Sequence, residues 1–365
     1  MKRFAAFLLA AVTLGAAFAP AQDTLFTRSD TVGYRCGENE GTFTFSEMND
    51  GDTLNIKLDC ELVFLSDCDT LVTRYSREPA DVVIVSKADT LSLKVIYAVR
   101  KIDFLRQYPD FGTTPAEDAP QFYYADPADS LLDELRARYN LDSVAGTGSE
   151  TEKIINLMRW AHHIVKHDGG STNPKPKNAL NLISVCEKEN RGVNCRMIAT
   201  ILNEAYLAMD FKSRHVTCMP IEKEFADCHV VNMVFSETLG KWLCMDPTFE
   251  GYLMDKDGTL VGISEVRQML IESEPLLISD NVNWNGEAYD RSAYKNYLTK
   301  NLFRFFCPLG SEPGYESNDG NLAWVYLNPA GYDSEKAGTA DTTGSEDSLR
   351  VDYYTDDADY FWTEP

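Results

Sequence analysis

Three residues in the middle third of the chain, Cys195, His229 and Asp246, have the types needed for catalysis by a cysteine nucleophile. A thiolate is a strong nucleophile, an imidazole can accept and return a proton, and a carboxylate beside the imidazole fixes its orientation. Each residue alone has a structural explanation, such as a disulfide partner, a core histidine or a strand-ending turn. The three together, with the helix start and the hairpin described below, predict a catalytic triad.

Cys195 is predicted to begin a buried helix. Asn194 before it is a favourable N-cap, and the residues from Met197 to Met209 are apolar around nearly the whole circumference. The helix dipole favours a thiolate at this position, and the N–H groups of the first turn have no intrahelical partners and can hold an oxyanion. We therefore expect Cys195 to be unpaired and to be alkylated fastest among the thiols at neutral pH.

A predicted hairpin brings His229 to Asp246. Two strand patterns flank a short turn that ends at Gly240. If Phe235 lies opposite Gly240, His229 lies opposite Asp246 on the same face of the sheet, because side chains at every second position share a face. We expect this face to meet the start of the Cys195 helix.

The chain contains nine cysteines, an odd number that leaves at least one thiol without an intramolecular partner. No C-x-x-C pair is present and there are only five histidines, so neither a metal nor another cofactor is expected. On the hairpin, Cys228 and Cys244 are predicted to point to opposite faces. A disulfide between them is therefore not expected.

Four other histidines are weaker candidates for chemistry. A capping box that starts at Ser149 predicts a helix that ends at a glycine pair shortly after His167. His162 and His163 are expected to have core or surface roles on this helix, and His167 lies near its end, where a cation suits the dipole. His215 falls in a strand pattern and is expected to be structural.

Residues 150–256 resemble the transglutaminase-like superfamily, whose members share a papain-like core with a Cys, His, Asp triad. The stretches that carry the resemblance are Arg191-Gly-Val-Asn-Cys-Arg-Met-Ile-Ala199, Lys212-Ser-Arg-His-Val216, His229 and Trp242-Leu-Cys-Met-Asp-Pro-Thr248. There are two departures: Asp210 stands where a glycine commonly closes the helix, and Val231 stands where an aromatic residue is common.

The resemblance implies acyl transfer from an amide through a thioester, with Cys195 attacking, His229 moving the proton and Asp246 orienting His229. Water as the acceptor gives a peptidase, amidase or deamidase, and an amine gives a cross-linking transglutaminase. We expect hydrolysis of a peptide, protein or glycoprotein, because water is the default acceptor. The alternatives are a glycoprotein amidase that removes glycans and a catalytically silent surface binding module.

The expected fold class is α+β, with a papain-like core of a central helix on an antiparallel sheet, preceded by a β-rich, sandwich-like domain. Asp-Thr-Leu occurs in the first part at 23–25, 52–54, 69–71 and 89–91, and each of the three later copies is predicted to open a turn into a strand. The predicted divisions are a signal peptide at 1–21, the β-rich domain at 22–106, a linker at 107–129, the catalytic domain at 130–330, and an acidic low-complexity loop with an aromatic tail at 331–365.

The N-terminus predicts export. Lys2 and Arg3 precede an uncharged apolar run from Phe4 to Phe18, and Ala19-Pro-Ala21 fits a cleavage site. The mature chain would then be periplasmic, cell-surface or secreted, with no transmembrane anchor. The formal net charge of −23 argues against a nucleic-acid partner, because such a chain repels phosphate.

Overall fold

The computed structural model describes residues 23–36, 39–56, 61–73, 79–97, 100–114, 120–126, 128–223, 227–317, 322–345 and 348–365. The predicted signal peptide at 1–21 lies outside these ranges. The chain divides into two compact units, Met1–Arg100 and Lys101–Pro365. Within the described ranges, no helix has the length and apolar character that a membrane crossing requires.

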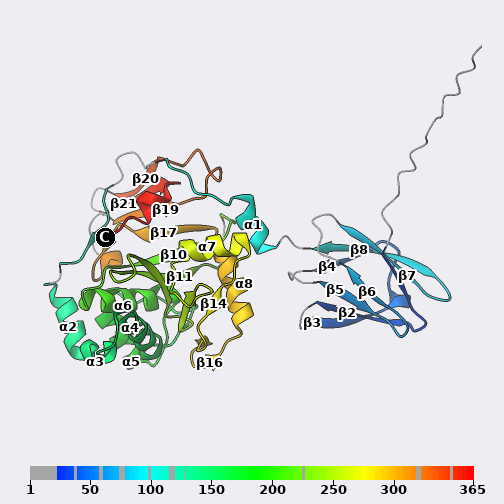
Figure 1. Ribbon diagram of the computed structural model, residues 1–365, viewed down its shortest axis with the longest axis horizontal. Helices are drawn as coiled ribbons and strands as arrows, with labels where there is room; N and C mark the ends of the chain where they lie inside the picture. The colour runs from blue at the N-terminus through cyan, green and yellow to red at the C-terminus, as the bar shows by residue number, and fades with distance from the viewer. Residues whose placement is uncertain are drawn as a thin grey trace, which may run out of the picture. The chain divides into compact units, whose positions relative to one another are not determined.

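The first unit consists of strands that form two four-stranded sheets (Figure 1). One sheet has the order β1-β7-β8-β4 and the other the order β3-β2-β5-β6. The bounds are β1 Asp23–Phe26, β2 Thr31–Cys36, β3 Asn39–Thr44, β4 Asp52–Ile56, β5 Leu62–Leu65, β6 Thr70–Thr73, β7 Ala80–Val85 and β8 Thr90–Tyr97. Leu25, Val82 and Leu93 of one sheet share a hydrophobic core with Val32 and Phe64 of the other, which is the arrangement of a sandwich.

The Asp-Thr-Leu copies mark strand starts for a local reason. Before β6 the N–H of Ser66 donates to the carbonyl of Asp69 (3.0 Å), and before β8 Ser86 and Asp89 form the same bond (2.9 Å). In both turns the aspartate Oδ1 accepts from the N–H of the threonine that follows, at 2.8 Å. The aspartate side chain therefore fixes the turn from which each strand begins.

The second unit is built on a nine-stranded sheet with the order β14-β13-β12-β11-β10-β17-β19-β21-β20. Its strands pair antiparallel except for β19 and β21, which are parallel. The bounds are β10 Ser213–Met219, β11 His229–Ser236, β12 Lys241–Asp246, β13 Gly251–Met254, β14 Leu277–Ile278, β17 Arg304–Pro308, β19 Leu322–Leu327, β20 Ala340–Ser345 and β21 Ser348–Thr355. Two short pairs stand apart: β15 Asn283–Trp284 with β16 Glu287–Ala288, and β9 Tyr123–Tyr124 with β18 Gly310–Ser311.

Helices cover both faces of the large sheet. The first group packs on the face that carries Val234, Leu243 and Met245, and it comprises α2 Ser130–Tyr139, α3 Leu141–Ala145, α4 Glu150–Ile164, α5 Ala179–Glu189 and α6 Cys195–Ala208. The second group packs on the face that carries Val231, Met233 and Cys244, and it comprises α1 Lys101–Gln107, α7 Ile263–Glu272, α8 Arg291–Asn301 and α9 Ala358–Phe361. Figure 1 shows α2 to α6 together on one side of the sheet. The described chain is thus a mixed helix-and-sheet protein.

Three parts of the predicted layout are wrong. The β-rich domain, predicted to end at 106, ends at Arg100, because helix α1 belongs to the second unit. The segment 107–129, predicted as a linker, belongs to the second unit, since Tyr108, Phe111 and Phe122 pack against its core. The segment 331–365, predicted as a low-complexity loop with an aromatic tail, contains β20 and β21, which pair at the edge of the large sheet. Backbone pairing with the next strand, β21, which itself pairs with β19, stabilises a sequence that has few apolar residues of its own.

Candidate active site

Cys195 is the first residue of α6, as the sequence predicted. The N-cap is Asn194, whose side-chain oxygen accepts from the N–H of Met197 at 3.1 Å. Every residue from Met197 to Ala208 is buried, so the helix is enclosed by the domain. Cys195 carries a free thiol, as do Cys228 and Cys244, which confirms that the last two are not bonded together.

His229 and Asp246 lie in neighbouring antiparallel strands, and the Nε2 atom of His229 is 2.6 Å from Oδ2 of Asp246. The contact confirms the predicted pairing of these side chains, but the predicted register is wrong by two residues. Phe235 lies opposite Trp242, because Gly240 has a positive φ of 62° and stays inside the turn. A shift of two preserves the face, so His229 reaches Asp246 diagonally.

The face of the sheet that carries this pair is not the face that packs on α6. Asn232 and Val234 contact α6, whereas Val231 and Met233, which continue the face of His229, pack in the core on the opposite side. This face therefore meets only the start of α6, through the interaction of His229 with the Cys195 thiol, as expected, whereas the body of the helix packs on the other face. His229 begins β11 and Asp246 ends β12, so the pair lies at the ends of the strands, where the N-terminus of α6 can reach it.

The carboxylate of Asp246 is fully occupied by hydrogen bonds. Its Oδ1 accepts from the N–H groups of Thr248 (3.0 Å) and Phe249 (3.2 Å). Its Oδ2 accepts from the hydroxyl of Tyr294 (2.9 Å) and contacts His229. Tyr294 comes from α8, outside residues 150–256, so no pattern in the sequence indicated its role.

The electrostatics favour a thiolate and an imidazolium. Burial raises the pKa of the Cys195 thiol, but its interactions with His167 and His229 outweigh burial and lower the pKa to about 6. Burial lowers the pKa of His229, but Asp246 and the Cys195 thiolate outweigh burial and raise it to about 10. At neutral pH the two groups therefore form an ion pair, which is the reactive state of a cysteine nucleophile.

His167 lies at the nucleophile, contrary to the sequence-based expectation of a helix end. Helix α4 ends at Ile164, and the next segment pairs with Val193: Val193 N–H donates to Lys166 O (3.0 Å) and Asp168 N–H donates to Val193 O (2.8 Å). These bonds replace helical ones, and they bring His167 beside the residues that precede Cys195. A local helical pattern cannot reveal such a long-range bridge.

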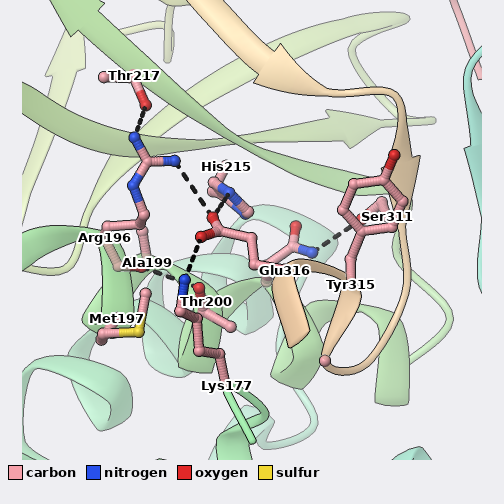
Figure 2. A network of polar contacts seen from close by, with 12 residues as sticks. Lys177, Arg196, Met197, Ala199, Thr200, His215, Thr217, Ser311, Tyr315 and Glu316 are labelled. Atoms are coloured by element: carbon pink, nitrogen blue, oxygen red, sulfur yellow. Dashed lines mark hydrogen bonds and ion pairs between the residues drawn. The ribbon is translucent and has the colours of Figure 1, made fainter. Parts of the chain in front are cut away.

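The start of α6 is anchored by a partly buried carboxylate (Figure 2). Glu316 lies 3.2 Å from Arg196, 3.1 Å from Lys177 and 3.3 Å from the Nε2 atom of His215. Burial raises the pKa of Glu316, but His215, Arg196 and Lys177 hold it far below its ordinary value. Because Arg196 follows Cys195 directly, this network fixes the first turn of the helix. The contact with Glu316 also agrees with the structural role expected for His215.

The remaining histidines differ in exposure. His162 is buried, with Nδ1 3.0 Å from the carbonyl oxygen of Pro247 and Nε2 2.7 Å from Oδ1 of Asn283. His163 is exposed. These positions agree with the core and surface roles expected for the two residues.

Comparisons with known proteins find only solved structures of low similarity. No protein-family model matches the chain, and no curated protein matches it. A candidate cysteine protease from Cytophaga hutchinsonii is 13% identical, with 72% of this chain and 90% of that chain covered and a TM-score of 0.28. Red sea bream transglutaminase is 10% identical, with 77% of this chain and 55% of that chain covered and a TM-score of 0.26. Similarity at this level decides neither fold nor activity.

Proposed function

We propose that this protein is a cysteine-nucleophile enzyme of the transglutaminase-like type, which cleaves an amide through a thioester and passes the acyl group to water. The observation that carries the proposal is the position of Cys195 at the start of α6, in interaction with His229, whose Nε2 is 2.6 Å from Asp246. A free Cys195 and an intact His229–Asp246 contact support catalysis over the alternative of a silent binding module.

The proposed reaction has two stages. The Cys195 thiolate attacks the amide carbon, and the carbonyl electron pair moves to oxygen, where the N–H groups of the first helical turn can stabilise it. The His229 imidazolium protonates the amide nitrogen, and the C–N bond breaks. The amine departs, and the acyl group remains on Cys195 as a thioester. Water then attacks, His229 accepts its proton through the nitrogen that does not face Asp246, and the thiolate departs.

A glycoprotein substrate is a second candidate, favoured by exposed aromatic side chains at the site. Trp284 is 44% exposed and hydrogen-bonds His167, and Tyr289 is 36% exposed with its ring 5.0 Å from that of Phe249. The Phe249 ring lies 5.6 Å from that of His229. Such aromatic rings combine a large apolar surface with a polar edge, which suits stacking on sugars.

We also propose that the protein is exported, because residues 1–21 have the pattern of a cleaved signal peptide. The acyl substrate would then be found in the periplasm, at the cell surface or outside the cell.

Trapping of the acyl-enzyme tests the function. Wild type, Cys195→Ala and Cys68→Ser are incubated with peptide amides and with Asn-linked glycopeptides, quenched in acid and analysed by intact mass and peptide mapping. Cys68 is a matched control, because it is a free, exposed thiol in the other unit. We expect an acyl adduct on Cys195 in wild type and Cys68→Ser, and no turnover in Cys195→Ala. Turnover that survives in Cys195→Ala would overturn the proposal.

The same reactions decide the acceptor when a primary amine is added. A free acid as the product supports hydrolysis, and a product that contains the added amine supports transfer. Release of an intact glycan amine from the glycopeptide, with the unmodified peptide amides untouched, would support the glycoprotein substrate.

A further inference from the structure

A second imidazole, His167, is held at the nucleophile by two segments that are distant in sequence. Its backbone bridges to Val193, two residues before Cys195. On the other side, its N–H donates to Oδ1 of Asn285 (2.7 Å) and its carbonyl accepts from Nδ2 of Asn285 (3.0 Å). The backbone of His167 is therefore held between the residues that precede Cys195 and the segment of Asn285.

The segment of His167 can approach the residues before Cys195 only because position 192 is a glycine. A Cβ atom added at Gly192 would lie 2.5 Å from the carbonyl oxygen of Lys166 and 2.9 Å from the Cβ of Asp168. A side chain at position 192 would push away the two neighbours of His167. The small residue before Cys195 thus permits the close placement of His167.

Trp284 sets the protonation pattern of the His167 ring. The Nε1–H group of Trp284 lies 3.1 Å from Nδ1 of His167. An indole N–H can only donate, so Nδ1 must accept and carries no proton. In the neutral ring the hydrogen is then on Nε2, and Nε2 is the nitrogen available to face the Cys195 thiol, with which His167 interacts.

Two imidazoles at one cysteine therefore have different chemistry. His229 is paired with a carboxylate and can hold or release a proton. His167 is paired with a donor, so a second proton on its ring would face the indole N–H. The His167 ring can therefore serve as a fixed, neutral hydrogen-bond donor, but it is not suited to proton transfer.

We propose that His167 is a further catalytic residue, which donates its Nε2–H to the sulfur of Cys195 and then to the oxyanion of the substrate, with its tautomer set by Trp284. The proposal rests on the proposed function, because an oxyanion forms only if Cys195 attacks an acyl group. As the thiolate attacks, negative charge moves from sulfur to the carbonyl oxygen, and the same N–H group can follow it. No proton leaves His167 in this step, so proton transfer stays with His229.

Variants of His167 and Trp284 test whether His167 is a catalytic residue. The measurements are ones that would not change if His167 had only a structural role. The set comprises His167→Ala, His167→Gln and Trp284→Phe, with His163→Ala as the matched control, because His163 is an exposed histidine on α4. The measurements are the pH dependence of Cys195 alkylation by iodoacetamide, ¹⁵N spectra of the His167 ring near neutral pH, and kcat and KM for an amide substrate.

We expect His167→Ala to move the alkylation curve to higher pH and to lower kcat about 10²–10³-fold with little change in KM, as loss of an oxyanion donor does. His167→Gln restores part of both effects, because its amide keeps an N–H donor. Wild type shows a protonated Nε2 and an unprotonated Nδ1, whereas Trp284→Phe shows a mixture of tautomers. His163→Ala matches wild type.

The two proposals fail in different ways. An alkylation curve that is unchanged in His167→Ala, or a protonated Nδ1 in wild type, would overturn the role of His167 alone. Wild-type protein that forms no acyl-enzyme with any amide would overturn the proposed function, whatever the alkylation curves show.

Discussion

At the scale of single residues, the orientation of His229 depends on how Asp246 is held. Both oxygens of the carboxylate accept hydrogen bonds, and one of the donors is the buried hydroxyl of Tyr294. Burial raises the pKa of Tyr294 well above its ordinary value, so the hydroxyl remains a donor at any working pH. Tyr294 thus acts on the chemistry through Asp246, as a positioning residue.

Tyr294→Phe should lower kcat/KM about tenfold, because one hydrogen bond to a charged group is worth about 1.5–3 kcal/mol and the ring still fills the site. Steady-state kinetics and urea unfolding measure the two effects. The matched control is Tyr206→Phe, which removes a buried hydroxyl that donates to the carbonyl oxygen of Ile154. The control should cost a comparable free energy of unfolding and leave kcat/KM unchanged. Equal losses of activity in both variants would contradict a positioning role.

The Cys195–His229 ion pair predicts a bell-shaped dependence of kcat/KM on pH. Activity should rise as the thiol loses its proton, with an apparent pKa near 6, and fall as the imidazolium loses its proton, near 10. Because the groups interact, both values belong to the pair. His229→Ala should shift the alkylation of Cys195 to higher pH, since the positive partner is gone. An alkylation curve centred at the ordinary thiol pKa in wild type would refute the ion pair.

At the scale of elements, a helix fixes the hairpin that carries the site. The carboxylate of Glu150, in the first turn of α4, accepts from the hydroxyl of Ser236 (2.5 Å) and from the N–H groups of Glu237 (2.9 Å) and Thr238 (3.0 Å). Ser236 is the last residue of β11, and Glu237 and Thr238 begin the turn to β12. The register that brings His229 to Asp246 is therefore held partly from outside the hairpin.

Glu150→Ala should lower the free energy of unfolding by about 1–2 kcal/mol, because it leaves several turn donors without their charged acceptor. Burial raises the pKa of Glu150, but the bonds from Ser236 and Thr238 lower it below its ordinary value. Its stabilisation is therefore present at neutral pH and is lost as the pH falls through the folded pKa. Denaturant unfolding measures this effect. The free energy of unfolding of Glu150→Ala should differ from that of wild type more near pH 7 than in acid.

The control for this variant is Glu134→Ala on α2. Glu134 forms an exposed ion pair with Arg138 at 3.1 Å, so its removal should change the free energy of unfolding by less than about 0.5 kcal/mol. A similar loss in the two variants would mean that Glu150 contributes only as a helix residue.

At the scale of the whole molecule, the end of the chain completes the core of the second unit. Phe361 is fully buried, and its carbonyl oxygen accepts from Arg214 at 3.0 Å. The Trp242 indole N–H donates to the carbonyl oxygen of Trp362 at 3.0 Å. The Arg214 guanidinium lies over the Trp242 ring, 4.4 Å from its centroid. Two of the residues that carry the family resemblance thus find their partners in the last residues of the chain.

The two units have separate hydrophobic cores, so we expect two unfolding transitions in calorimetry. Leu93→Ala should destabilise the first unit by about 2–5 kcal/mol, because it empties a buried site in the sandwich core. Leu202→Ala, at a buried position of α6, should act on the other transition. Leu93→Ala should also leave the alkylation rate of Cys195 unchanged. A single transition that moves with both variants would show that the units unfold together.

The sequence was sufficient for those features that depend on local pattern. Asn194 and the apolar run after Cys195 predicted the start and the burial of α6. Alternation predicted the strands of His229 and Asp246, and a hairpin preserves the face of a side chain even when its register moves by two. The contact between these two side chains was therefore predicted correctly from a register that was wrong.

The other groups that meet the nucleophile are brought there by the folding of the chain. His167 lies at Cys195 because a backbone bridge to Val193 ends α4 early, and Trp284 and Tyr294 reach the site from segments more than 80 residues beyond Cys195. Hydrogen bonds between distant segments leave no periodic signal in the sequence, because each partner is chosen by the folded backbone. Composition, caps and periodicity therefore determined the nucleophile and its histidine–aspartate pair, and the packing of the chain determined the residues that tune them.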